Sequence, residues 1–211
     1  MNRQQQQAIL IARKIISLLS PHSGQTEEDI AHFIQKQLKK YGARPAFRVI
    51  VASGPRSALP HGRATARKLG RGELVVIDFG ALYNGYRSDV TRTFVLGPAS
   101  PRQKKIMQVV LAAQQRAIRA VRAGERCSTV DRAARGYIER KGCGKYFIHS
   151  TGHGIGQRVH QSPKISRKNH RRLKAGQVIT IEPGIYLKGW GGVRIEDMVE
   201  VTKKGCRILT R

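Results

Sequence analysis

The sequence predicts a mixed α/β protein made of two copies of one helix–helix–strand unit. Amphipathic helical patterns alternate with short Val- and Ile-rich runs, and this order occurs twice along the 211 residues. Landmarks of the second copy fall 100 to 102 residues after those of the first. Such a repeat predicts one domain with two halves, 1–97 and 98–211, related by a pseudo-twofold axis. The alternative is that helix pairs precede strands in both halves by chance.

Each element of the first half has a local signal. Residues 4–19 are predicted to form a helix because apolar residues recur at helical spacing. Its apolar stripe consists of Ile9, Ala12, Ile16 and Leu19. Thr26 and Asp29 have the spacing of a capping box, so a second helix is expected between them and Gly42. Short Val and Ile runs bounded by Gly and Pro predict two strands, 49–52 and 74–79.

The second half repeats these signals in the same order. A helix of about 20 residues is expected from Pro101, with its end marked by Gly124. Ser128 and Asp131 form the next predicted capping pair, and Gly142 ends the helix that they begin. Two further strands are predicted from Val-rich runs, 178–181 and 193–201.

Composition excludes several classes of protein. Hydrophobic residues make up 40% of the chain, and no apolar run approaches the roughly 18 residues of a membrane helix, which excludes a membrane protein. Three cysteines without a CxxC pair exclude a disulfide framework and a zinc knuckle, and without a secretory signal they predict a cytoplasmic protein. The 40 Lys and Arg against 13 Asp and Glu give a net charge of +27. This charge indicates an environment or a partner that tolerates or uses it.

Two aspartates are predicted to converge on one site in the first half. Asp78 ends an apolar strand, where a lone carboxylate is costly to bury without a partner. Asn84-Gly85 is a strong hairpin signal, and as a two-residue turn it pairs residue 78 with residue 91. Asp89, two residues before that partner, then shares a sheet face with Asp78, with the two backbones about 7–8 Å apart.

Two glutamates repeat this arrangement in the second half. Glu182 follows the strand 178–181, and Glu196 lies in the next strand beyond a glycine-rich turn. They come 104 and 107 residues after Asp78 and Asp89, so each half delivers two carboxylates to the centre. The alternative is that each is a surface residue or the ion-pair partner of one of the many arginines. Four buried anions need cations, and an oxygen-rich site selects divalent metal ions.

A nitrogen ligand is available in the segment 149–160, which contains three histidines. Glycines at 152, 154 and 156 flank His153 and allow the backbone a close approach to a site. The spacing does not fit a helical HExxH zinc site, and a lone histidine is more often structural than a ligand. Three histidines in twelve residues favour a functional segment.

Seven strings of this sequence resemble the metallopeptidases of the pita-bread fold, and within them the Xaa-Pro aminopeptidase and prolidase branch. The resemblance runs from about residue 5 to the C-terminus. The strings are Val51-Ala-Ser-Gly54, Pro60-His61-Gly62, Ile77-Asp-Phe-Gly-Ala-Leu-Tyr-Asn-Gly-Tyr86, Ser88-Asp-Val-Thr-Arg-Thr-Phe94, 149–160, Ile181-Glu-Pro-Gly-Ile-Tyr186 and Gly192-Val-Arg-Ile-Glu-Asp197. The implied fold is α/β (α+β), with duplicated half-domains and a curved antiparallel sheet.

The resemblance also implies a role for each site residue. Asp78 would bind one metal ion, His153 and Glu182 the other, and Asp89 and Glu196 would bridge both. Glu182 would also act as the proton carrier. The residues implied to hold substrate and stabilise developing charge, or to support the site, are His61, His149, His160 and Arg194.

The implied activity is hydrolysis of N-terminal Xaa-Pro bonds by a hydroxide that bridges two divalent ions. Mn²⁺ is the preferred ion, and Co²⁺, Fe²⁺ or Zn²⁺ would also suit this ligand set. The substrates would be peptides with proline at the second position. An Xaa-Pro dipeptidase and a methionine aminopeptidase are the lesser alternatives. Retention of every ligand argues against the metal-free members of the family.

One departure and one rival accompany this hypothesis. Most members of the branch carry a separate N-terminal domain, whereas this chain is expected to be the catalytic domain alone, which leaves the oligomeric state open. An aminopeptidase acting on longer peptides is slightly preferred on that ground. The rival is a basic platform for nucleic acid or the ribosome, because segments 30–72 and 140–181 each hold ten Lys and Arg and no acid. The low aromatic content, 6%, disfavours it.

Overall fold

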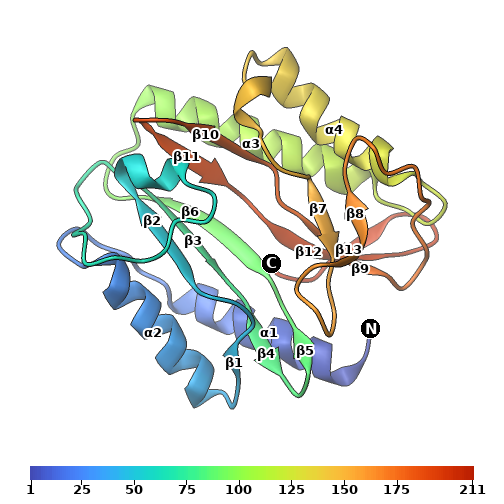
Figure 1. The fold of residues 1–211 in the computed structure, drawn as a ribbon, viewed down its shortest axis with the longest axis horizontal. Coiled ribbons are helices and arrows are strands. Elements are labelled where there is room, and N and C mark those ends of the chain that lie inside the picture. Colours follow the sequence, from blue (N-terminus) through green and yellow to red (C-terminus); the bar gives the residue numbers. More distant parts are fainter.

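The computed structural model describes all residues from Met1 to Arg211. Each half contributes a helix pair and a set of antiparallel strands, and Figure 1 shows the strands lying between the two helix pairs. The helices are α1 (Arg3–Leu18), α2 (Glu27–Lys40), α3 (Pro101–Ala120) and α4 (Cys127–Arg140). The α/β class and the repeated helix–helix–strand order are therefore as predicted.

The strands form four antiparallel sheets, none of which crosses from one half to the other. The first half contains β1 (Arg44–Pro45), β2 (Ile50–Ser53), β3 (Leu74–Phe79), β4 (Ala81–Tyr83), β5 (Tyr86–Arg87) and β6 (Val90–Val95). The second half contains β7 (Gly152–Gly154), β8 (Gln161–Ile165), β9 (Val178–Ile181), β10 (Gly184–Leu187), β11 (Gly191–Arg194), β12 (Asp197–Val201) and β13 (Cys206–Ile208). Two short 3-10 helices are η1 (Gly54–Ala58) and η2 (Gly144–Tyr146).

The first helix pair follows the sequence pattern closely, with one correction. The capping box of α2 is formed as predicted, since Thr26 and Asp29 exchange side-chain-to-backbone hydrogen bonds. The buried stripe of α1 is shifted by one position from the predicted one, because Ile15 is buried while Ile16 and Leu19 are only half-buried. The other buried apolar residues of α1 are Ala8, Ile9, Ile11 and Ala12.

The predicted capping pair of α4 is wrong. The helix begins at Cys127 with Arg126 at its N-cap, and no side chain caps it. Asp131 is fully buried instead, where it forms an ion pair with Arg135 and accepts a hydrogen bond from the Thr151 hydroxyl. The ion pair with Arg135 and the contact with Thr151 therefore take precedence over the capping pattern of this carboxylate. The helices α2 and α4 are offset by 100 residues at both ends.

The strand registers confirm the first hairpin and divide one predicted strand. Tyr83 pairs with Tyr86 and Asp78 with Thr91, as the Asn84-Gly85 turn requires, and both turn residues have positive φ. The predicted strand 193–201 is two strands, β11 and β12, which separate at Ile195-Glu196. β11 pairs with β10, whereas β12 pairs with β9. Between them the Glu196 amide donates to the Thr91 carbonyl of the first half.

Each half packs its own apolar core between helices and strands. Residues of α1, α2, β2, β3 and β6 form one core, and residues of α3, α4 and β9–β13 form the other. Polar contacts join the halves between these cores, where Arg194 and Thr93 exchange hydrogen bonds through the Thr93 hydroxyl. Apolar contacts join the halves as well, since Ile9 of α1 packs with Ile155, Val178, Met198 and Leu209, and Leu74 of β3 belongs to the second core. The site lies at this junction of the two halves. None of the helices combines the length and the apolar character needed to cross a bilayer.

Candidate metal centre

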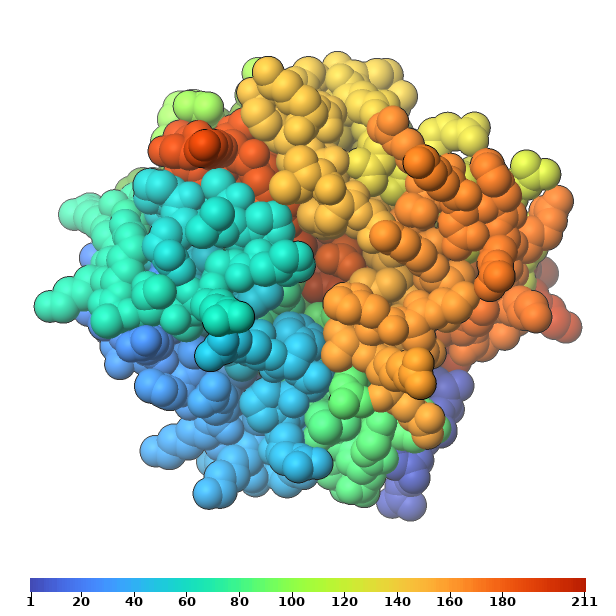
Figure 2. Space-filling model, in the orientation of Figure 1, coloured from blue at the N-terminus to red at the C-terminus, as the bar shows by residue number.

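A cavity of about 1090 Å³ opens between the two halves. Figure 2 shows the hollow between the N-terminal half, in blue to green, and the C-terminal half, in yellow to red. Its lining includes every site residue named from the sequence: His61, Asp78, Asp89, His149, His153, His160, Glu182, Arg194 and Glu196. Residues separated by up to 135 positions thus share one cavity.

His153 presents one ring nitrogen to the carboxylates. It lies in β7, and its Nδ1 is 3.1 Å from the carbonyl oxygen of Gly154, which can only accept a hydrogen bond. Nδ1 therefore carries a proton. Nε2 lies 3.3 Å from Glu182 Oε1 and 3.6 Å from Asp89 Oδ2. Burial lowers the pKa of His153, but the hydrogen bond to Glu182 and the charge of Glu182 raise it overall, so Nε2 also holds a proton that a bound metal ion would replace.

The carboxylates surround this nitrogen. Single ligand atoms of Asp89, His153 and Glu196 all lie within 4.8 Å of one another. Glu182 joins the group through its contact with His153, and Asp78 lines the same cavity. Two of the buried oxygens, Asp78 Oδ1 and Glu196 Oε1, have no hydrogen-bond partner. Buried carboxylate oxygens without a partner are costly, so these residues fit divalent cations in both number and type.

Burial shapes the pKa values of these groups in the absence of metal. Desolvation, reinforced by neighbouring carboxylates, raises the pKa of Asp89 and of Glu196 well above the usual range. Desolvation also raises the pKa of Asp78, although the Arg194 guanidinium opposes it. Glu182 differs: burial alone would raise its pKa, but the hydrogen bond and charge of His153 lower it to about 2.

Arg194 joins one carboxylate to a histidine. Its Nη2 donates to Asp78 Oδ2 at 2.7 Å, and its Nη1 donates to the Tyr186 hydroxyl at 2.9 Å. The Tyr186 hydroxyl lies 2.8 Å from His149 Nε2, and His149 Nδ1 lies 2.8 Å from the Ser150 carbonyl. A carbonyl accepts only, so Nδ1 donates to Ser150 and Nε2 accepts from Tyr186. Both nitrogens of His149 are thus engaged within the protein.

Two residues of this network were not assigned a role from the sequence. Tyr186 is buried, and burial raises its pKa to about 12, so its hydroxyl stays protonated. Thr91 donates to Glu196 Oε2 at 2.7 Å and accepts from Arg194 Nε at 3.0 Å. Strand parity could have indicated both, because every second residue of a strand lies on the same face. Tyr186 has the parity of Glu182, and Thr91 has the parity of Asp89.

His61 and His160 lie at the exposed side of the cavity. The His160 ring packs edge-on against the His153 ring, with centroids 4.4 Å apart. Burial, followed by the charge of His153, lowers the pKa of His160. His61 lies in the exposed segment after η1, next to Pro60, whose carbonyl accepts from Arg194 Nη1 at 3.1 Å. Both rings are therefore placed to face a bound molecule.

Comparison with known proteins identifies the family. The model of metallopeptidase family M24 matches residues 2–203. This chain belongs to metallopeptidase family M24. An M24 relative from Pyrococcus furiosus named Xaa-Pro dipeptidase is 50% identical over 189 residues, which are 89% of this chain and 54% of the relative.

Solved M24 structures agree with the fold. The prolidase from Pyrococcus furiosus matches with a TM-score of 0.96 at 46% identity, over 99% of this chain and 63% of that one. An X-Pro aminopeptidase from Thermotoga maritima matches with a TM-score of 0.94 at 44% identity, over 99% of this chain and 60% of that one. The pita-bread fold predicted from the sequence is confirmed. The chain spans just over half the length of the curated relative described above.

Proposed function

We propose that this protein is a metal-dependent aminopeptidase that hydrolyses N-terminal Xaa-Pro bonds. The observation that carries the proposal is the buried group of carboxylates around His153 Nε2, with two carboxylate oxygens that lack partners. The names of the relatives support the Xaa-Pro specificity, and they include both a dipeptidase and an aminopeptidase. We favour the aminopeptidase because the cavity, about 1090 Å³, has room for more than two residues.

Five residues would hold two divalent ions: Asp78, Asp89, His153, Glu182 and Glu196. Mn²⁺ suits four carboxylates and one imidazole, and Co²⁺, Fe²⁺ or Zn²⁺ could replace it. When bound, the ions would supply an activated water and polarise the scissile carbonyl. The chain contributes the remaining steps of the reaction.

Glu182 is the residue that we assign to proton transfer. It lines the cavity beside His153, and a carboxylate in that place can accept a proton from the attacking water. It would then deliver that proton to the proline nitrogen as the carbon–nitrogen bond breaks. Proline nitrogen is tertiary in the amide and becomes a secondary amine only after this transfer, which makes a proton donor essential.

The four histidines of the cavity have three different proposed roles. His153 is a ligand, while His149 is held by Tyr186 and Ser150 and so positions Tyr186 beside Arg194. His61 and His160 would hold the substrate and stabilise charge that develops on its carbonyl oxygen. Arg194 orients Asp78 through the 2.7 Å ion pair and offsets part of the rise that burial causes in the pKa of Asp78.

Cleavage of an Xaa-Pro peptide with and without metal tests the proposal. We expect the Mn²⁺-loaded protein to release the N-terminal residue of Ala-Pro-Gly-amide, and chelation to abolish this release. Glu182→Ala is expected to lose more than about 100-fold in kcat. Equal inertness of the native protein and Glu182→Ala, together with tight and salt-sensitive polyanion binding, would support the rival binding platform.

A further inference from the structure

The active-site cavity has opposite charges at its two ends. The carboxylates of the floor are buried, whereas four cationic residues that line the same cavity are exposed at its mouth. These residues, which we call the cationic rim, are Arg48, Arg63, Lys164 and Arg171. Two come from each half of the molecule. No rim side chain forms an ion pair, although nine other arginines do.

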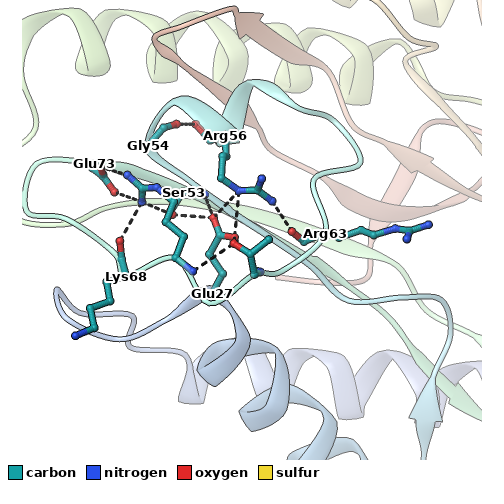
Figure 3. Close-up of polar contacts among 10 residues, drawn as sticks. Glu27, Ser53, Gly54, Arg56, Arg63, Lys68 and Glu73 are labelled. Atoms are coloured by element: carbon teal, nitrogen blue, oxygen red, sulfur yellow. Dashed lines mark hydrogen bonds and ion pairs between the residues drawn. The ribbon is translucent and has the colours of Figure 1, made fainter.

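The backbone of Arg63 is held by a partly buried polar network. Its carbonyl accepts a 2.6 Å hydrogen bond from Arg56 Nη2, and Arg56 Nε lies 3.3 Å from both carboxylate oxygens of Glu27. Glu27 is fully buried at the start of α2. Figure 3 shows the Arg63 guanidinium pointing away from this cluster, with no contact drawn to it. The network thus fixes the backbone and leaves the charge free for another molecule.

A bound peptide would cross this charge gradient in a fixed direction. Given the proposed function, its N-terminal residue and scissile bond lie at the floor beside the carboxylates and His153. The residues that follow proline then lead outward, past the cationic rim. A free cation at the mouth of a cleft attracts an anionic group and disfavours a cationic one.

We infer that the cationic rim selects substrates with a carboxylate downstream of proline. The inference rests on the proposed function for the direction of the peptide. The carboxylate is that of an Asp or Glu side chain directly after proline. This group would face Arg63 and its three neighbours, and the basic side chains of Lys or Arg at that position are disfavoured.

A matched peptide series tests the rim. The substrates are Ala-Pro-Asp-amide, Ala-Pro-Asn-amide and Ala-Pro-Lys-amide, compared by kcat/KM with the Mn²⁺-loaded protein. We expect the Asp peptide to exceed the Lys peptide by about threefold to tenfold at low salt, and the ratio to approach one at high salt. Ala-Pro-Gly with a free carboxylate, compared with its amide, measures the effect of a C-terminal carboxylate separately, and the amide series keeps that effect out of the side-chain comparison.

Rim variants assign the preference to these residues. Arg63→Gln is expected to reduce the Asp-to-Lys ratio, and Arg63→Glu to invert it. Arg132→Gln removes the same charge from an exposed position on α4 and is expected to leave the ratio unchanged. Arg171→Gln tests the opposite side of the rim and serves as the second variant if Arg63 variants fold poorly.

The outcomes separate this inference from the proposed function. Cleavage of all three peptides at equal rates, unchanged by Arg63→Glu, would overturn the rim inference while the peptidase assignment stands. If no peptide is cleaved, binding of the same fluorescently labelled peptides to the metal-loaded protein still tests the rim. Preferential binding of the Asp peptide that Arg63→Glu abolishes would then support the rim, and indiscriminate binding would overturn it.

Discussion

Arg194 is the side chain at which the polar contacts of the site converge. Its guanidinium donates to Asp78, Thr91, Tyr186 and the Pro60 carbonyl, so one residue of the second half contacts three segments of the first half. Desolvation opposes its charge, but the nearby Tyr186, Asp78 and Glu182 raise the pKa of Arg194 well above its usual range. The guanidinium is therefore a permanent charge that positions other groups.

Loss of the Tyr186 hydroxyl tests this network. Tyr186→Phe leaves one Arg194 donor and His149 Nε2 without a partner, so we expect a loss of about 1–3 kcal/mol in the free energy of unfolding. We also expect kcat to fall about tenfold, with metal content unchanged, because Asp78 and His149 lose their alignment. Tyr83→Phe is the control for both measurements, because the Tyr83 hydroxyl makes no hydrogen bond in the structure.

The Arg67–Glu73 pair gives a pH-dependent prediction outside the site. Hydrogen bonds from Arg67, aided by the Gly70 amide, lower the pKa of Glu73 against the effect of burial. Because the pKa of Glu73 is lower in the folded protein, its ionised form stabilises the fold at pH values above the unfolded pKa of about 4.3. This stabilisation is lost as the pH falls through the folded pKa. Urea unfolding should show Glu73→Gln less stable at neutral pH and nearly equal to the native protein near pH 3. A difference that is unchanged at low pH would contradict this origin.

The segment between β2 and β3 depends on one buried carboxylate. Glu27 accepts hydrogen bonds from the amides and hydroxyls of Ser53 and Thr65, in addition to its contact with Arg56. Ser53 and Thr65 flank the residues that carry His61 and Arg63 to the cavity. Glu27 therefore closes this segment as a loop on the start of α2.

Glu27→Gln is expected to destabilise the protein by about 2–3 kcal/mol. The new amide NH₂ group can only donate, but it would face the donor groups of Ser53 or Thr65. Arg56 would also lose its ionic partner. Glu28→Gln is a matched control one residue away, because Glu28 is exposed and makes no ion pair, and a change below about 0.5 kcal/mol is expected. Chemical denaturation measures both variants, and equal effects would show that the loop does not depend on Glu27.

Local signals predicted the elements well where the responsible residues lie close in sequence. The Asn84-Gly85 turn sets the register that brings Asp78 and Asp89 together, and the Thr26 capping box starts α2. Ser128 and Asp131 show the opposite case, because Arg135 of the same helix and the Thr151 hydroxyl take the carboxylate that the capping pattern would use. Tyr186 was missed because its role depends on the Arg194 and His149 side chains that its hydroxyl contacts.

The whole molecule consists of two main cores, and their junction combines charged and polar groups with a small apolar cluster around Ile9. The sequence repeat predicted this architecture and the set of cavity residues, because matched carboxylates in two similar halves must meet near the axis. It did not predict the split at Ile195-Glu196, which depends on the Thr91 carbonyl of the other half. Of the 40 basic residues behind the net charge of +27, four form the cationic rim for which we propose a role in substrate selection.

Bound divalent metal should stabilise the whole molecule because ligands come from both halves. At 100-fold excess over Kd, Mn²⁺ is expected to add about 2.7 kcal/mol and to raise Tm by roughly 5–10 °C. Differential scanning fluorimetry with and without a chelator measures the shift. Glu196→Gln is expected to reduce it, whereas Glu139→Gln, an exposed change outside the cavity, is expected to leave it intact. A shift that survives Glu196→Gln would indicate metal bound elsewhere.

The central claim is that the two halves deliver one metal centre, and counting bound metal tests it most directly. The protein is loaded with Mn²⁺, passed through gel filtration and analysed by elemental mass spectrometry. The account predicts about two ions per chain in the native protein, and fewer in Asp89→Asn and Glu196→Gln. Retention of no metal by the folded native protein, or retention unchanged in both variants, would contradict it.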